Sequence, residues 1–373
     1  LEKTKYCINK IKSFKLEISE DIIDYNILNA NYLKDLGAFE KYDLIMDMYH
    51  EAEVKADQLI EASHEKDLIN SIVKKALVHY NRSIILRWWK KDIENALADI
   101  NKTIELTENK YDWLYYLSLS EKVDMITKIE NSLKNLNELK NDLYKCIDYY
   151  SERNNFEKLS RAFYRLSKVE SQSYSIEEDN DHKKIIILKV LQNYEKARDF
   201  ALEGNIEQLY AIAQAHILST IILIKKHKIS SNLIEKYTDD ILLNLFNDTI
   251  NDLELLETSW SKRVLRDLLW NKIEFLKING SNDFIGLYEK ALEISISKPL
   301  HPKKGKDMER TANLLHSYLD YLYSNEQYND CDKLILKHKS LLEIWFNIEI
   351  EKIDISKLIK MLLTIAKKPD NYG

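Results

Sequence analysis

The chain has 373 residues, of which 45% are hydrophobic and 31% charged, and its formal net charge at pH 7 is −6. Phosphate binding needs a clustered basic face, so this acidic balance argues against nucleic acid as a main partner. No segment approaches the ~18 uninterrupted apolar residues of a membrane-spanning helix, so we expect no membrane partner.

Glycine and proline are scarce, with six and three residues, well below the usual ~7% and ~5%. Helix breakers are therefore absent over long stretches, and few turns of special geometry are needed. This composition predicts an all-α fold.

An apolar spacing of three and four recurs along the chain, interrupted each time by a short polar break. The pattern predicts a helix, a turn and a second helix that folds back on the first. We expect six such helical hairpins, in chain order at residues 26–49, 80–106, 143–166, 197–213, 268–292 and 315–338. Recurring hairpins bury their apolar faces against one another, which predicts an elongated array.

The segments between the hairpins complete the expected organisation. Residues 118–139 and 233–256 are candidates for additional helices, whereas residues 171–182 (acidic, with few apolar side chains) and 298–306 (two prolines and a glycine) are expected to be loops. We therefore expect one array over residues 1–373, in which the acidic loop 171–182 divides a half at 1–170 from a half at 183–373.

Two segments resemble the second helix of a tetratricopeptide repeat: residues 92–106, with Ala96 near the start, and residues 284–294. The resemblance implies a right-handed superhelix of antiparallel helical hairpins, that is, a tetratricopeptide-like α-solenoid. The small residue of the family's first helix is present as Ala30 and Ala197, but larger residues occupy it elsewhere. The hairpins also start further apart than the ~34 residues of that family. An armadillo-like or generic α-solenoid is the alternative.

The sequence contains no zinc-protease helix motif, phosphate-binding glycine loop or nucleophile elbow. We therefore expect no enzymatic activity, no cofactor and no metal. Cys7, Cys146 and Cys331 are odd in number and widely spaced, which favours small buried side chains in a reducing, cytoplasmic compartment over disulfides. His338 lies on an apolar helical face, where a core position is expected.

One spacing is compatible with catalysis. Arg310 and His316 are separated by five residues and resemble the arginine–histidine pair of a family of all-helical ribonucleases. In that family the pair polarises a phosphate and moves a proton. Chance also produces such a spacing in a chain with nine histidines, so the ribonuclease is an alternative to the binding function described next.

In a tetratricopeptide-like array the first helices of the hairpins line a concave face. Their side chains outside the hairpin seam would contact a protein or peptide, because aromatic rings supply contact area while amides and guanidinium groups satisfy backbone and carboxylate groups. By template position these candidates are Asn31, Asn81, Arg82, Trp88, Trp89, Tyr144, Lys145, Tyr194, Arg198, Arg266, Trp270, Asn313, His316 and Tyr323.

Each candidate also has a structural explanation. Neighbours on a helix diverge by ~100°, so Trp88 and Trp89 cannot both face the core, and one of them can pack under the next unit. Tyr144 and Tyr194 can fill the seam, and Lys145 can be a solvated charge.

The abundance of lysine, isoleucine and asparagine suggests a low-GC bacterium or its phage. We expect a recognition or sensor module of a signalling or defence protein, and the absence of an initiator methionine leads us to expect a piece of a longer protein. The alternative within signalling is a peptide-pheromone receptor of the Gram-positive type, although no N-terminal helix-turn-helix is evident. The sequence leaves the oligomeric state open.

Overall fold

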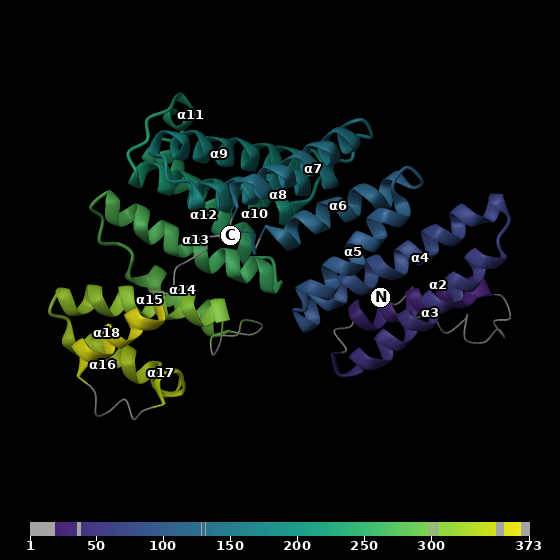
Figure 1. Cartoon of the computed structure of the whole chain (residues 1–373). Coiled ribbons are helices and arrows are strands. Elements are labelled where there is room, and N and C mark those ends of the chain that lie inside the picture. Colours follow the sequence, from purple (N-terminus) through teal and green to yellow (C-terminus); the bar gives the residue numbers. More distant parts are fainter. Residues whose placement is uncertain are drawn as a thin grey trace. The chain divides into compact units, whose positions relative to one another are not determined.

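The computed structural model describes residues 19–35, 39–127, 129–130, 132–297, 300, 302, 305–347 and 354–366. Every regular element within these residues is a helix and none is a strand (Figure 1), so the predicted all-α class is confirmed. The chain forms two compact units, Leu1–Arg153 and Asn154–Gly373, which are described separately.

The first unit is a succession of helices in which each packs against the next along the chain. Its elements are α2 (Ser19–Asp35), η1 (Phe39–Lys41), α3 (Tyr42–Ala62), α4 (Glu65–Ile85), the π-helical turn η2 (Leu86–Lys90), α5 (Ile93–Thr107), α6 (Asp112–Ile126) and α7 (Leu133–Ser151). The first and second predicted hairpins are confirmed as α2–α3 and α4–α5. The segment 118–139 contributes the end of α6 and the start of α7 instead of forming one helix.

Small and β-branched side chains allow the helices of the first unit to approach closely. Ala30 on α2 and Ala52 on α3 are fully buried in one cluster with Ile45 and Tyr49. Ala96 on α5, the residue that carries the tetratricopeptide resemblance, is fully buried in the neighbouring cluster.

The second unit continues the same architecture. Its helices are α8 (Phe156–Ile176), α9 (Asn180–Glu203), α10 (Glu207–Lys226), α11 (Asn232–Glu235), α12 (Asp239–Glu254), α13 (Ser259–Ile278), α14 (Ile285–Ile296), α15 (Gly305–Ser324), α16 (Tyr328–Lys337), α17 (Lys339–Phe346) and α18 (Ile355–Ala366). The fourth, fifth and sixth predicted hairpins are confirmed as α9–α10, α13–α14 and α15–α16, and α18 also packs on α15. The additional helix expected at 233–256 is present as α11 and α12.

The third predicted hairpin spans the boundary between the units. Its two helices, α7 and α8, are both present, but α7 belongs to the first unit and α8 to the second. The pairing of these two helices therefore stays a prediction.

The acidic segment 171–182 is not the loop that its composition predicts. Residues 171–176 continue α8 and residues 180–182 begin α9, so only Glu177–Asp179 lie between the helices. The acidic side chains act locally, since the Asp179 carboxylate accepts hydrogen bonds from the backbone N–H groups of Asp181 and His182 and caps α9. The loop expected at 298–306 lies mostly outside the described residues, and its last two residues begin α15.

α10 is long and apolar enough by composition to cross a membrane, with a mean hydropathy of 1.3 over its most apolar window. However, 67% of that window is buried within the protein, which is the arrangement of a core helix. Cys146, Cys331 and His338 are also buried, as their positions predict. Cys7 lies outside the described residues.

Gly204 lies at the end of α9 with a φ of −83°, a backbone conformation that any residue can adopt. A glycine is needed there because the neighbouring side chains leave little room for a Cβ atom. A Cβ atom there would lie 2.9 Å from Ile206 Cδ1 and 3.1 Å from Phe156 Cβ. We expect Gly204→Ala to lower the free energy of unfolding of the second unit by about 1–3 kcal/mol through overpacking.

Gly286 on α14 is the matched control, since nothing lies within 4 Å of its Cβ position. Gly286→Ala should stabilise the helix by up to about 1 kcal/mol. Urea unfolding followed by circular dichroism measures both variants, and equal stability of the two would contradict the packing assigned to Gly204.

Candidate functional site

Helices α13 and α15, the first helices of two successive hairpins, are joined by polar contacts at two places along their length. Near their N-termini the Asp307 carboxylate accepts hydrogen bonds from Arg266 Nη1 (3.0 Å) and Arg263 Nη2 (2.9 Å). Further along both helices, Lys277 Nζ at the end of α13 lies 3.4 Å from Ser317 Oγ in the second half of α15. The two helices therefore run side by side in the same direction, as first helices of a repeat array do.

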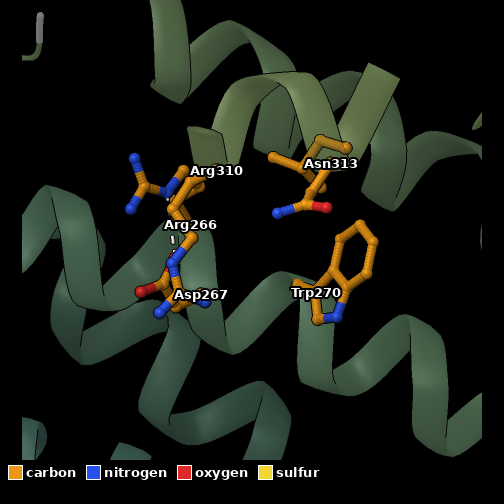
Figure 2. Close-up of a pocket in the computed structure, with 6 residues that line it drawn as sticks. Arg266, Asp267, Trp270, Arg310 and Asn313 are labelled. Atoms are coloured by element: carbon orange, nitrogen blue, oxygen red, sulfur yellow. Dashed lines mark hydrogen bonds and ion pairs between the residues drawn. The ribbon is translucent and has the colours of Figure 1, made fainter. Parts of the chain in front are cut away.

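A pocket of about 70 Å³ lies between these polar contacts. It is lined by Arg266, Asp267 and Trp270 from one face of α13 and by Arg310, Asn313 and Leu314 from one face of α15. Figure 2 shows Arg266, Asp267 and Arg310 on one side of the hollow and Trp270 and Asn313 on the other.

Arg266 is the electrostatic centre of the pocket. It is only 3% exposed, and its guanidinium donates through Nε to Asp267 Oδ1 (2.9 Å) and through Nη1 to Asp307. Burial by itself would raise the pKa of Asp307, but the hydrogen bonds and charges of Arg263 and Arg266 outweigh it and lower that pKa to about 2. The cluster is therefore a fixed ion-pair network at neutral pH.

Three of the predicted partner-binding residues, Arg266, Trp270 and Asn313, meet in this pocket. Arg310, which the sequence analysis considers as part of a ribonuclease pair, also lines the pocket. Asp267 and Leu314 line it as well and were not predicted. The signal for both was available in the sequence, since each directly follows a lining residue on the same helix. Whether these side chains contact a partner stays a prediction.

The candidates on α2 and α4 are engaged within the first unit. Asn31 accepts a hydrogen bond from Tyr49 Oη (2.9 Å), and Asn81 donates to the backbone of its own helix. Arg82 binds Asp99 through Nε and Nη2, both at 2.7 Å, and pairs with Glu53. Arg82 thus ties α3, α4 and α5 together. Whether these three side chains also contact a partner stays a prediction.

The two tryptophans of η2 take the opposite orientations that the sequence predicts. Trp88 is 59% exposed, whereas Trp89 packs against the buried cluster of α2 and α3. On α7, Tyr144 is exposed and Lys145 pairs with Asp142. None of these four side chains lines the pocket described above.

The remaining candidates lie in the second unit, outside the pocket. Tyr194 is buried and stacks on His216, with 5.0 Å between ring centroids, so it fills the seam. Arg198 pairs with Asp199, Tyr323 is partly exposed against Tyr328, and His316 is half-buried.

Arg310 and His316 both lie on α15, and whether they act together on a phosphate stays a prediction. Six residues along a straight helix separate two side chains by ~9 Å of rise and place them ~120° apart around the axis. Arg310 lines the pocket and His316 does not. The two groups therefore do not converge on one position in this pocket.

We expect the ion pairs of Asp307 to stabilise the packing of α13 against α15. Because Asp307→Asn removes one of the two carboxylates that pair with the buried Arg266, we expect the free energy of unfolding to fall by about 2 kcal/mol at pH 7. Urea unfolding measures this change. Asp320→Asn, an exposed carboxylate on the same helix, should change it by less than about 0.5 kcal/mol.

Asp307→Asn should also alter the pH dependence of the free energy of unfolding. The pKa of Asp307 is lowered from 3.8 to about 2, so its contribution is present above pH 4 and is lost as the pH falls from about 4 to about 2. This amounts to about 2 kcal/mol that Asp307→Asn should lack. Identical acid profiles for the two proteins would contradict the ion pair.

No protein-family model matches the chain, and no curated protein matches it. Among solved structures it is similar to a protein described as a circular tandem repeat protein with novel repeat topology and enhanced subunit contact surfaces. The identity is 10%, the match covers 94% of this chain and 83% of that chain, and the TM-score is 0.25. At that score the likeness carries no argument, and the assignment of a helical array depends on the packing of successive helices within each unit.

Proposed function

We propose that the chain is a non-catalytic helical-repeat module that binds a protein or peptide partner through the pocket between α13 and α15. It would serve as the recognition part of a bacterial signalling or defence protein, and its hairpins would be divergent relatives of the tetratricopeptide repeat. The observation that supports this function is the meeting of Trp270, Asn313 and Arg310 in one pocket, on two first helices held in fixed register.

The size of the pocket favours a macromolecular partner. About 70 Å³ is well below the ~300–1,000 Å³ of sites that enclose a small molecule. Such a volume accepts one side chain of a larger partner, whose remaining contacts would lie on the surrounding surface. An indole beside an amide and a guanidinium is typical of the residues that dominate protein interfaces.

The chemistry of the lining residues favours binding over catalysis. Asp267 and Asp307 are both committed to Arg266, and no histidine lines the pocket. A general base needs to reach the proton that it removes, and no uncommitted acid–base pair meets this requirement at the pocket.

Peptide display tests the proposal. A library of random peptides is selected on the whole protein, and the affinities of the selected peptides are measured by calorimetry for the wild type and for Trp270→Ala. Loss of an aromatic anchor should weaken binding by about 2 kcal/mol, roughly 30-fold.

Trp113→Ala is the matched control, because Trp113 is an exposed tryptophan of the first unit (43% exposed) outside the pocket. Its affinity for the same peptides should equal that of the wild type. The proposal is wrong if Trp270→Ala and Trp113→Ala bind equally well, or if selection yields no peptide that binds.

A further inference from the structure

The hairpin α15–α16 carries an exposed pair of tyrosines outside the pocket. Tyr323, at the end of α15, is 37% exposed, and Tyr328, at the start of α16, is 48% exposed. Their rings lie edge to face, with 5.5 Å between the ring centroids. Two tyrosine rings that touch each other and still face solvent are a platform for a flat cationic group.

One carboxylate lies a single helical turn from each tyrosine. Asp320 precedes Tyr323 by three residues on α15, and Asp332 follows Tyr328 by four residues on α16. Residues three or four apart are neighbours on the surface of a helix. Both carboxylates are exposed, so each flanks the tyrosine pair from its own helix.

The two carboxylates lie at the same level of the hairpin. Cys331 Sγ lies 4.0 Å from the backbone oxygen of Leu319, and Asp332 and Asp320 directly follow these two residues. Because the two helices are antiparallel, a step of one residue from this contact turns both side chains toward the same face of the hairpin. The tyrosine pair and both carboxylates therefore share one face.

This face is negatively charged. The segment 311–332 contains no lysine or arginine, and its four carboxylates are those of Asp320, Glu326, Asp330 and Asp332. Asp330 pairs with Lys333 at 2.8 Å, whereas the other three form no ion pair within the part of the chain that the structure describes. Charge complementarity therefore specifies a cation as the group that this face binds.

The charged face continues the side of α15 that lines the pocket. Asn313, Asp320 and Tyr323 are separated by seven and three residues, which places them within about 80° around the helix axis. Asp320 lies ~10 Å along the axis from Asn313, a distance that about three residues of extended chain cover. A partner that fills the pocket can therefore also reach the tyrosine pair.

We infer that this face of the hairpin α15–α16 binds a basic side chain, arginine in particular, of the protein or peptide partner. This inference rests on the proposed function and adds a second anchor to it. The guanidinium stacks on the tyrosine pair, and its N–H groups donate to Asp320 and Asp332. Arginine fits better than lysine, because its planar group stacks on a ring and faces two carboxylates at once.

The inference is tested with N-acetylarginine amide, a minimal arginine without charged termini. In protein labelled with ¹³C at the tyrosine rings, the signals of Tyr323 and Tyr328 are identified by their absence in Tyr323→Phe and Tyr328→Phe. We expect both signals to shift on titration with a Kd of ~1–10 mM, and added salt should weaken the binding. Unshifted signals at ~50 mM N-acetylarginine amide overturn the inference.

Two further probes test the role of charge. N-acetylcitrulline amide has the shape of the arginine probe without its charge, and N-acetylglutamate amide has the opposite charge. Each should bind at least about 10-fold more weakly than N-acetylarginine amide. An equal or stronger response to either probe contradicts the inference.

Substitution of the two carboxylates separates recognition from folding. The double variant Asp320→Asn, Asp332→Asn keeps the size of both side chains and removes their charge, so the affinity for N-acetylarginine amide should fall at least about 10-fold. Asp248→Asn, an exposed carboxylate on α12, should bind like the wild type. Thermal unfolding should show that both proteins remain folded, and equal affinities of the two would refute the role of the carboxylates.

Failure of this inference is distinguishable from failure of the proposed function. If displayed peptides bind in a Trp270-dependent way and lose no affinity for the double variant, the binding function stands and the arginine anchor is wrong. If N-acetylarginine amide binds but no displayed peptide does, the arginine site stands and peptide binding is wrong.

Discussion

The ion pairs of Asp307 with Arg263 and Arg266 are the constraint on which the candidate site depends. A buried carboxylate is stable only when nearby cations and hydrogen bonds compensate its desolvation, and here both guanidinium groups come from the neighbouring first helix. Because Arg266 is itself buried, its position is fixed by Asp307 on α15 and Asp267 on α13. The pocket is therefore organised before any ligand arrives, which lowers the entropic cost of binding.

Buried ion pairs between helices also occur in the first unit. Arg82 contacts Asp99 and Glu53, and Arg87 pairs with Glu121 and Asp124. Arg82 joins α4 to its neighbours α3 and α5, whereas Arg87 joins η2 to α6, and each guanidinium faces two carboxylates. Buried ion pairs thus hold helices together in both units, and in the second unit they also border a pocket.

The sequence predicts the helices of this protein well, because apolar periodicity and the scarcity of glycine and proline are local signals. Five of the six hairpins follow from it directly. It misjudges residues 171–182, since acidic side chains that cap a helix have the same composition as a loop. Helical position alone does not reveal partners on other helices, such as Asp99 for Arg82 or His216 for Tyr194. The pocket depends on two faces that are more than 40 residues apart in sequence, and only the packing of α13 beside α15 reveals which side chains meet.

The π-helical turn η2 has a consequence for how the first unit tolerates changes in length. One residue more than an α-helical turn is accommodated there, and the chain leaves it through Lys91 in the left-handed conformation. The wide turn stands at the end of the helix that α4 begins, where the backbone N–H of Lys91 donates to Leu86 O. A deletion of residue 86 or 87 would rotate the side chains that follow it in this turn by about 100° about the axis of α4. Trp89 would then take the exposed position of Trp88 and lose its packing against the cluster of α2 and α3, so this contact limits the length of the turn.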